Sequence, residues 1–198
     1  MKKLLVLLFS LLISFNSYGG LFDKTVCVET ETVERGGLIY LPNKTKPFTG
    51  KNLCEYKSGQ YKSQGKIKKG VKDGKWTYWF ENGEIKSERR YEDGKQDGKQ
   101  TWWDESGQIY KEANYKDGEK NGKVTGWHEN GQIFYEVNYK DGKLDGKETS
   151  WYESGQIKEE RNWKDKLLNG KSTFWEENGQ IRWEINLKDG KCISGDCD

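Results

Sequence analysis

Few residues in this chain are of types that could carry out chemistry. His128 is the sole histidine, and no serine or cysteine motif accompanies it as a nucleophile. No phosphate-binding loop and no metal-binding spacing is present. The 32 aspartates and glutamates recur periodically, whereas a catalytic site usually interrupts a pattern. The sequence therefore predicts no catalytic residue, no metal site and no cofactor, and an enzyme is not expected.

Aromatic side chains are the other candidates, because exposed rings can stack on a ligand. They make up 14% of the chain, although only 32% of residues are hydrophobic. Six side chains at positions that vary between repeated segments form the candidate binding surface, opposite the regular tryptophan column described below. They are Tyr78, Phe80, Trp102, His128, Tyr152 and Phe174.

These side chains are positioned by a 24-residue repeat. Glycine recurs at that interval in two series, with no insertion or deletion. The series are Gly50, Gly74, Gly98, Gly122, Gly146 and Gly170, and Gly59, Gly83, Gly107, Gly131, Gly155 and Gly179. The resulting six units are 50–73, 74–97, 98–121, 122–145, 146–169 and 170–191.

Each unit is expected to form a β-hairpin. In 98–121, residues 100–104 are rich in Thr and Trp, and Ser106-Gly107 is a turn whose counterpart elsewhere is Asn-Gly. The residues from Ile109 to Tyr115 then alternate with a period of two. No helical apolar spacing occurs after the N-terminal segment. The predicted fold is all-β.

Residues 24 positions apart are expected to stack. A lone hairpin is marginal in water, but stacking buries the apolar columns in one ribbon of core. Each buried aromatic ring contributes about 2–3 kcal/mol. The columns are Trp79, Trp103, Trp127, Trp151 and Trp175; Ile85, Ile109, Ile133, Ile157 and Ile181; and Tyr91, Tyr115, Tyr139, Trp163 and Leu187.

Two charged columns accompany the apolar ones. Stacked like charges repel, so we expect the two columns to lie close enough to alternate in sign. This pattern predicts a solvated stabilising ladder rather than paired catalytic carboxylates. The columns are Lys75, Lys99, Lys123, Lys147 and Lys171, and Glu88, Glu112, Glu136, Glu160 and Glu184.

The N-terminal segment has the pattern of a signal peptide over 1–19. Lys2 and Lys3 precede an apolar run over 4–13, and small residues at 17–19 follow. The run is shorter than the roughly 20 apolar residues needed to span a bilayer; an uncleaved anchor is the alternative. We expect an exported protein that is periplasmic, secreted or at the cell surface.

Charge is balanced in the exported chain. The sequence has 34 Lys+Arg and 32 Asp+Glu, and loss of Lys2 and Lys3 makes the two equal. A neutral surface with both signs of charge evenly mixed lacks the basic patch that binds nucleic acid or anionic lipid. We therefore expect no nucleic-acid partner and no membrane partner after signal cleavage.

Four cysteines in an exported chain predict two disulfide bonds. Two strands per unit advance about 10 Å along the array, so its two ends lie far apart. The expected pairs are therefore Cys27–Cys54 and Cys192–Cys197, one at each end. Metal binding by the cysteines is the weaker alternative, because His128 is far from both pairs.

The repeats resemble the MORN-repeat superfamily in its bacterial variant, the YwqK-type antitoxin family. The resemblance covers roughly 37–191 and includes a lead-in at 37–50. It implies an elongated single-layer antiparallel sheet of stacked hairpins. The clearest copy reads Trp79-Phe80-Glu81-Asn82-Gly83-Glu84-Ile85, then Glu88, Tyr91, Asp93-Gly94-Lys95 and Asp97-Gly98-Lys99.

The predicted organisation is a signal peptide at 1–19, an N-terminal cap at 20–49, six MORN-type repeats at 50–191, and a C-terminal disulfide loop at 192–198. Two units depart from the pattern: Glu55 replaces the column tryptophan, and Lys166 stands where glycine is expected. Atypical terminal units are typical of caps. Lys166 predicts a locally altered turn.

The hypothesis that fits best is a non-catalytic protein-binding module, whose partner is a toxin, a secreted effector or a host surface protein. The resemblance implies toxin neutralisation, which in an exported chain would act as immunity to an exported toxin. The alternative is a cell-wall or carbohydrate-binding repeat protein with exposed aromatic rings. Fold alone does not decide between them.

Overall fold

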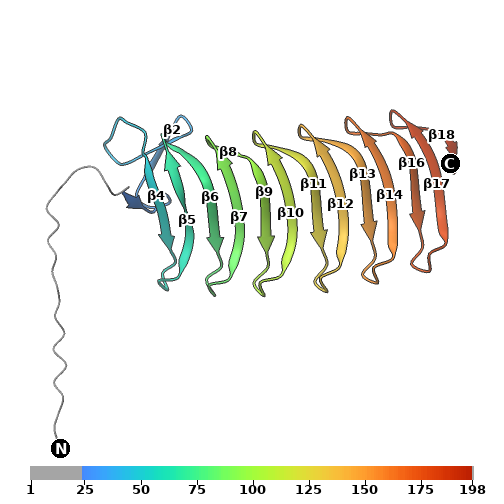
Figure 1. The fold of residues 1–198 in the computed structure, drawn as a ribbon, viewed down its shortest axis with the longest axis horizontal. Coiled ribbons are helices and arrows are strands. Elements are labelled where there is room, and N and C mark those ends of the chain that lie inside the picture. The colour runs from blue at the N-terminus through green and yellow to red at the C-terminus, as the bar shows by residue number, and fades with distance from the viewer. Residues whose placement is uncertain (1–23, 198) are drawn as a thin grey trace, which may run out of the picture.

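The computed structural model describes residues 24–197 and contains strands and turns but no helix in that range (Figure 1). The predicted signal peptide lies outside the described residues, and no described helix could cross a membrane. The strands are β1 (Thr25–Val26), β2 (Val33–Arg35), β3 (Leu38–Tyr40), β4 (Gly50–Glu55), β5 (Tyr61–Lys68), β6 (Val71–Trp79), β7 (Ile85–Glu92), β8 (Lys95–Gln96), β9 (Gly98–Trp103), β10 (Ile109–Lys116), β11 (Glu119–Trp127), β12 (Ile133–Lys140), β13 (Lys143–Trp151), β14 (Ile157–Lys164), β15 (Leu167–Leu168), β16 (Gly170–Trp175), β17 (Ile181–Lys188) and β18 (Lys191–Gly195).

Consecutive hairpins join edge to edge in one 16-stranded sheet, whose main path runs β1-β4-β5-β6-β7-β9-β10-β11-β12-β13-β14-β16-β17-β18. The short strands β8 and β15 pair with β7 and β14 beside this path, and β2 and β3 form a separate two-stranded sheet. The long strands stand in a row from one end of the molecule to the other (Figure 1). Every pairing is antiparallel except that of β1 with β4. The predicted all-β single-layer fold is confirmed.

The loop within each hairpin differs in type from the turn that joins it to the next hairpin. At Asn82-Gly83 the Phe80 N–H donates to the Glu84 carbonyl across a three-residue loop, with Gly83 at φ +94°. The Asn82 side chain accepts from the Glu84 N–H and donates to the carbonyl of Glu105 in the next unit. The loop is therefore a three-residue hairpin with glycine in the left-handed region, rather than a two-residue turn.

The turns that join consecutive hairpins hold two residues at positive φ, as a type I′ turn requires. Asp-Gly supplies both positions in four turns, and Lys69-Gly70 adopts the same conformation in the first unit. In the fifth unit Asp165 and Lys166 lie at φ +48° and +72°. Lys166 therefore takes the backbone conformation of glycine, and the turn expected to be altered keeps its shape.

One face of the sheet, the uniform face, repeats the same lysine and glutamate positions in the second to sixth units. Lysine of one strand forms an ion pair with glutamate of the partner strand, at 2.7 Å for Lys99–Glu112 and 2.8 Å for Lys123–Glu136. These lysines are exposed, so each pair contributes at most about 1 kcal/mol. The pairs are Lys75–Glu88, Lys99–Glu112, Lys123–Glu136, Lys147–Glu160 and Lys171–Glu184.

The opposite face, the variable face, carries the most buried apolar side chains. Here the residue type changes from unit to unit, as at Trp76, Gln100 and Val124. Two buried clusters form on it. They comprise Val26, Phe48, Ile67, Trp76 and Tyr91 near the N-terminal end, and Ala113, Val124 and Val137 in the middle.

The predicted core columns are buried to different degrees. Tyr91 and Leu187 are buried, and the column tryptophans are half-buried. Ile157 and Ile181 are exposed at 40% and 56%, which corrects their assignment to the core. All five isoleucines of the column begin a strand next to a hairpin loop of a single-layer sheet, where cover is partial. The first three are half-buried and the last two are exposed.

Disulfide bonds are present at both ends, joining Cys27 to Cys54 and Cys192 to Cys197. At the first end β1 adds parallel to β4, and the Val28 N–H donates to the side chain of Asn52 at 3.0 Å. This segment covers the N-terminal edge of the sheet. The second bond closes a loop that includes most of β18. This strand begins at Lys191 and therefore crosses the predicted boundary between the last repeat and the C-terminal disulfide loop at 191/192.

Candidate functional site

The aromatic residues of the predicted binding surface are half-buried, not freely exposed. Tyr78 packs against the cluster around Trp76, and Trp102 packs against the cluster of Ala113, Val124 and Val137. The ring of Phe174 stacks on Trp183 with centroids 5.8 Å apart. All three lie on the variable face, where they form part of its packing.

The other three predicted residues form a column at the entrance to the hairpin loops. Tyr152 donates to the Trp175 carbonyl of the next unit at 2.8 Å, and His128 Nε2 lies 3.4 Å from the Trp151 carbonyl. Phe80 lies beneath the ammonium of Lys86, 5.3 Å from its ring centroid. His128 thus links two units rather than pointing only to solvent.

His128 also lines an open depression of about 700 Å³ together with Trp127, Glu129, Asn130, Phe134 and Glu153. The Phe134 ring lies 5.3 Å from the imidazole and is 38% exposed. Among residues 24–197 no cluster of His, Cys, Asp or Glu is arranged to hold a metal ion. The depression offers an aromatic ring flanked by carboxylates and an amide.

Lysine and arginine side chains lie over the aromatic rings of the variable face. Lys72 Nζ lies 4.5 Å from the Trp76 ring centroid and 5.3 Å from that of Tyr91. It also donates to the Tyr78 hydroxyl at 2.7 Å. Burial lowers the pKa of Lys72 and the positive charge of Arg89 lowers it further. Burial also raises the pKa of Tyr78, so that phenol stays neutral.

The same arrangement continues along the next units. The guanidinium of Arg89 lies 5.0 Å from the Tyr78 ring centroid and 5.9 Å from that of Trp102. Lys111 Nζ lies 5.5 Å from the Trp102 ring centroid, and Lys120 Nζ lies 4.7 Å from that of Tyr139. Burial lowers the pKa of Lys111, and the charge of Lys120 adds to this effect.

These four cations have no carboxylate partner within 4.0 Å among the described residues. Arg89 Nε is in addition buried without a hydrogen-bond partner in that part of the chain. Leaving such groups unpaired costs free energy. We call Lys72, Arg89, Lys111 and Lys120, with the rings of Tyr78, Trp102 and Tyr139, the cationic–aromatic patch.

The charge of the variable face reverses in the fifth unit. Glu148 accepts a hydrogen bond from the Trp163 indole N–H at 2.6 Å. Glu159 forms an ion pair with Arg161 at 2.6 Å, and burial raises the pKa of Glu159. The face therefore carries positive charge without carboxylate partners in its first to third units and carboxylates in its fifth.

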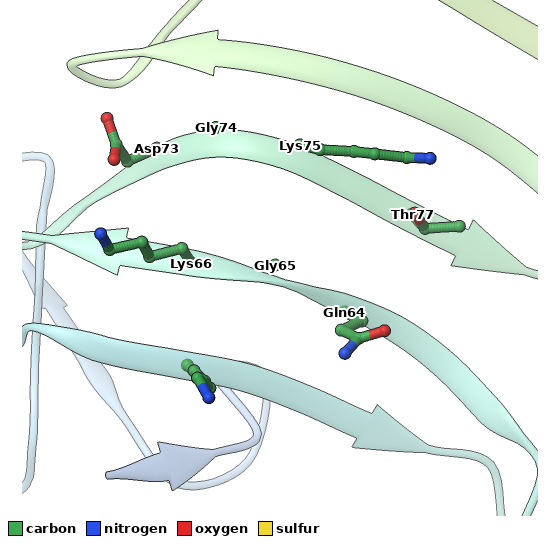
Figure 2. A pocket seen from close by; sticks show the side chains of 8 residues that line it. Gln64, Gly65, Lys66, Asp73, Gly74, Lys75 and Thr77 are labelled. Atoms are coloured by element: carbon green, nitrogen blue, oxygen red, sulfur yellow. The ribbon is translucent and has the colours of Figure 1, made fainter. Parts of the chain in front are cut away.

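Shallow hollows lie on the uniform face where the units meet. One of about 480 Å³ opens beside Gly65 and Gly74, which have no side chains, and its rim carries Lys66, Asp73 and Lys75 (Figure 2). A similar hollow of about 440 Å³ recurs one unit further along, beside Gly98. The hollows follow from the repeat geometry and gather no special chemistry.

Sequence reasoning missed the cationic–aromatic patch because it averaged the charges over the chain. The sequence did contain a signal, because lysine appears at a position where other units have a different residue type. Lys111 occupies a position filled by Ser87, Tyr135 and Trp183 in other units. Only the strand register places Lys111 and Lys120 on the face opposite the lysine ladder.

One comparison concerns the central units. The family described as MORN repeat variant matches residues 72–93, 96–117, 120–141 and 144–165. These four central segments are similar to that repeat variant. MORN repeats are generally modules that bind proteins or membranes, and a non-catalytic binding role is consistent with this match.

Other comparisons add little. No curated protein matches the chain. Among solved structures it is similar to the GtfA/B complex bound to UDP and GlcNAc, at 15% identity and a TM-score of 0.27, over 57% of this chain and 22% of that one. It is also similar to a point mutant of S. aureus TarM bound to Fondaparinux, α-GlcNAc-glycerol and UDP, at 12% identity and a TM-score of 0.28, over 62% and 20%. The chain spans about a fifth of the length of these proteins.

Proposed function

We propose that this protein is an exported, non-catalytic module that binds another protein through the variable face of its MORN-repeat sheet. The observation that carries this proposal is the contrast between the two faces. One repeats a self-paired Lys–Glu ladder in the second to sixth units. The other changes its side chains from unit to unit and holds unpaired cations over half-buried rings.

Two further observations support this role. An open array of stacked units presents an extended surface rather than an enclosed pocket, and repeat proteins use such surfaces to bind partners. The two disulfide bonds fit an oxidising environment such as export provides. The partner is a toxin, a secreted effector or a surface protein of a host, and toxin neutralisation is the case that the sequence resemblance favours.

Crosslinking in native extract tests this function. The protein is expected to capture a partner, and capture should fall when Trp102→Ala removes a ring from the variable face. Lys123→Gln changes the uniform face and should leave capture intact. Equal capture by both variants and the wild type would show that the variable face is not the docking surface.

Carbohydrate binding is a second candidate, supported by the depression around His128. Phe134 and Trp127 supply rings there, while Glu129, Asn130 and Glu153 supply hydrogen-bonding groups. Such combinations stack on and hydrogen-bond to sugars. Sedimentation with purified cell-wall polysaccharide tests it: binding that Phe134→Ala abolishes would favour this function, and no sedimentation would reject it.

A further inference from the structure

The cationic–aromatic patch extends along the sheet in the direction in which the units repeat. Lys72 and Lys120 occupy positions two units apart, and each unit advances about 10 Å. The patch therefore spans about 20 Å, the length of roughly six residues of an extended chain. An elongated ligand that lies across the strands would contact all four cations.

Positive charge that is half-buried without a carboxylate partner costs desolvation free energy, which the aromatic rings around it offset only in part. Burial lowers the pKa of both Lys72 and Lys111, so the protein environment disfavours these charges. A ligand carboxylate would restore the missing partner in a partly desolvated setting, where charge-assisted hydrogen bonds are strong. The ligand chemistry that complements the patch is thus anionic.

The carboxylates in the fifth unit narrow the choice of anion. Glu148 and Glu159 lie further along the same face, beyond Lys120. A uniform polyanion that covered the whole face would meet repulsion there. A polypeptide can place acidic residues over the patch and a basic residue over Glu148, whereas Glu159 is already paired with Arg161. It also offers backbone N–H and C=O groups.

We propose that the variable face binds an extended acidic segment of a protein, with its carboxylates on Lys72, Arg89, Lys111 and Lys120 and a basic residue beyond them toward Glu148. This inference rests on the proposed function and specifies the chemistry of the partner. The rings of Tyr78, Trp102 and Tyr139 form the apolar floor beneath the carboxylates.

Two pairs of lysines give matched tests of the proposal. Lys120 and Lys123 lie on one strand, β11, but on opposite faces, and Lys123 is already paired with Glu136. Lys111 and Lys99 lie on the neighbouring strands β10 and β9, and Lys99 is paired with Glu112. Substitution of any of these lysines by glutamine removes one positive charge. Only the face differs.

The experiment measures fluorescence anisotropy of a labelled peptide of consecutive glutamates followed by lysines, added to the full-length protein. Lys111→Gln/Lys120→Gln should weaken binding by about tenfold or more, whereas Lys99→Gln/Lys123→Gln should change it by less than about twofold. A peptide with glutamine in place of glutamate should not bind. Equal losses in the two double variants would overturn the proposal.

Heparin and phosphatidylglycerol vesicles serve as uniform polyanions. Binding of either as tightly as the peptide, with the same dependence on Lys111 and Lys120, would overturn the choice of a polypeptide. Crosslinking with the same variants separates this inference from the proposed function. If a partner is captured only when Lys111 and Lys120 are intact, but the peptide does not bind, only the acidic segment is rejected. If capture does not depend on these two lysines, docking on the variable face is rejected.

Discussion

The indole ring of Trp76 covers the backbone of Gly65 on the neighbouring strand. A Cβ atom at Gly65 would lie 2.2 Å from the ring, and the indole N–H donates to the Lys66 carbonyl at 3.1 Å. A large residue on one strand is thus matched by the smallest residue on the next. The same match recurs at Gly126, where an added Cβ would lie 2.3 Å from the ring of Tyr135.

This match predicts strong coupling between the two residues. Gly65→Ala should lower the free energy of unfolding by about 2 kcal/mol, because the ring has no room to move. Trp76→Val alone should cost about 3 kcal/mol by leaving a cavity. The double variant Gly65→Ala/Trp76→Val places the same residue types as Ala113 and Val124, which stand at the equivalent positions two units further along. Its loss of unfolding free energy should therefore be smaller than the sum of the two single losses. Urea unfolding measures all three, and additive losses would contradict the match.

Lys166 stores backbone strain that a substitution can release. A residue with a Cβ atom costs about 1–2 kcal/mol in the left-handed region, where Lys166 lies at φ +72°. Lys166→Gly should therefore raise the free energy of unfolding by about 1 kcal/mol, less a small loss from the more flexible unfolded chain. Thermal unfolding provides the measurement.

The matched control for this substitution is Gly118→Lys at the equivalent turn. Gly118 lies at φ +90°, and an added Cβ there would meet Lys95 at an ordinary 3.7 Å. The variant should therefore lose about as much stability as Lys166→Gly gains. A change of the same sign in both variants would show that backbone conformation is not the cause.

The two disulfide bonds should contribute unequally. The Cys27–Cys54 bond closes a separation of 27 residues and Cys192–Cys197 one of 5, for which loop entropy gives about 3.5 and about 2 kcal/mol. Replacement of Cys27 and Cys54 by alanine should also uncover the N-terminal edge of the sheet. Comparison of unfolding midpoints for the two double variants measures this order, and a larger loss at the C-terminal end would contradict it.

Lys111 should make stability depend on pH in the alkaline range. Its pKa in the folded protein lies below the ordinary 10.5, so between the two values the unfolded chain binds more protons. Stability therefore rises with pH through that window. Lys111→Met removes the cost of burying this charge, so the variant should be more stable than the wild type near neutral pH. This difference in the free energy of unfolding should shrink as pH increases toward 10.5. Urea unfolding at several pH values measures the difference, which a pH-independent gap would contradict.

Much of the fold follows from the spacing of glycines in the sequence. Gly83 and Gly94 require positive φ at the two ends of a hairpin, and a fixed interval between such positions defines the stacked units. The all-β class and the long sheet of consecutive hairpins follow from that interval. The two disulfide bonds follow from the distance between the ends of the array.

The candidate site was less predictable, because the sequence does not reveal how each face is covered. Regular columns were assigned to the core, yet Ile157 and Ile181 are exposed at 40% and 56% while the irregular Gln100 is fully buried. Burial in a single layer depends on which neighbouring strand supplies a large side chain. The positions of Lys111 and Lys120 likewise depend on strand register, which a column of residue types does not specify.

The disulfide bonds also determine how this sheet would respond to mechanical tension. β1 and β18 lie at opposite ends of the row of strands (Figure 1), so a pull between them acts along the hydrogen bonds that join the strands. Such bonds open in succession rather than together. Cys27–Cys54 ties β1 covalently to β4, whereas Cys192–Cys197 closes only a local loop. Unravelling would therefore start at β18, and each 24-residue unit released would yield up to about 80 Å of extended chain.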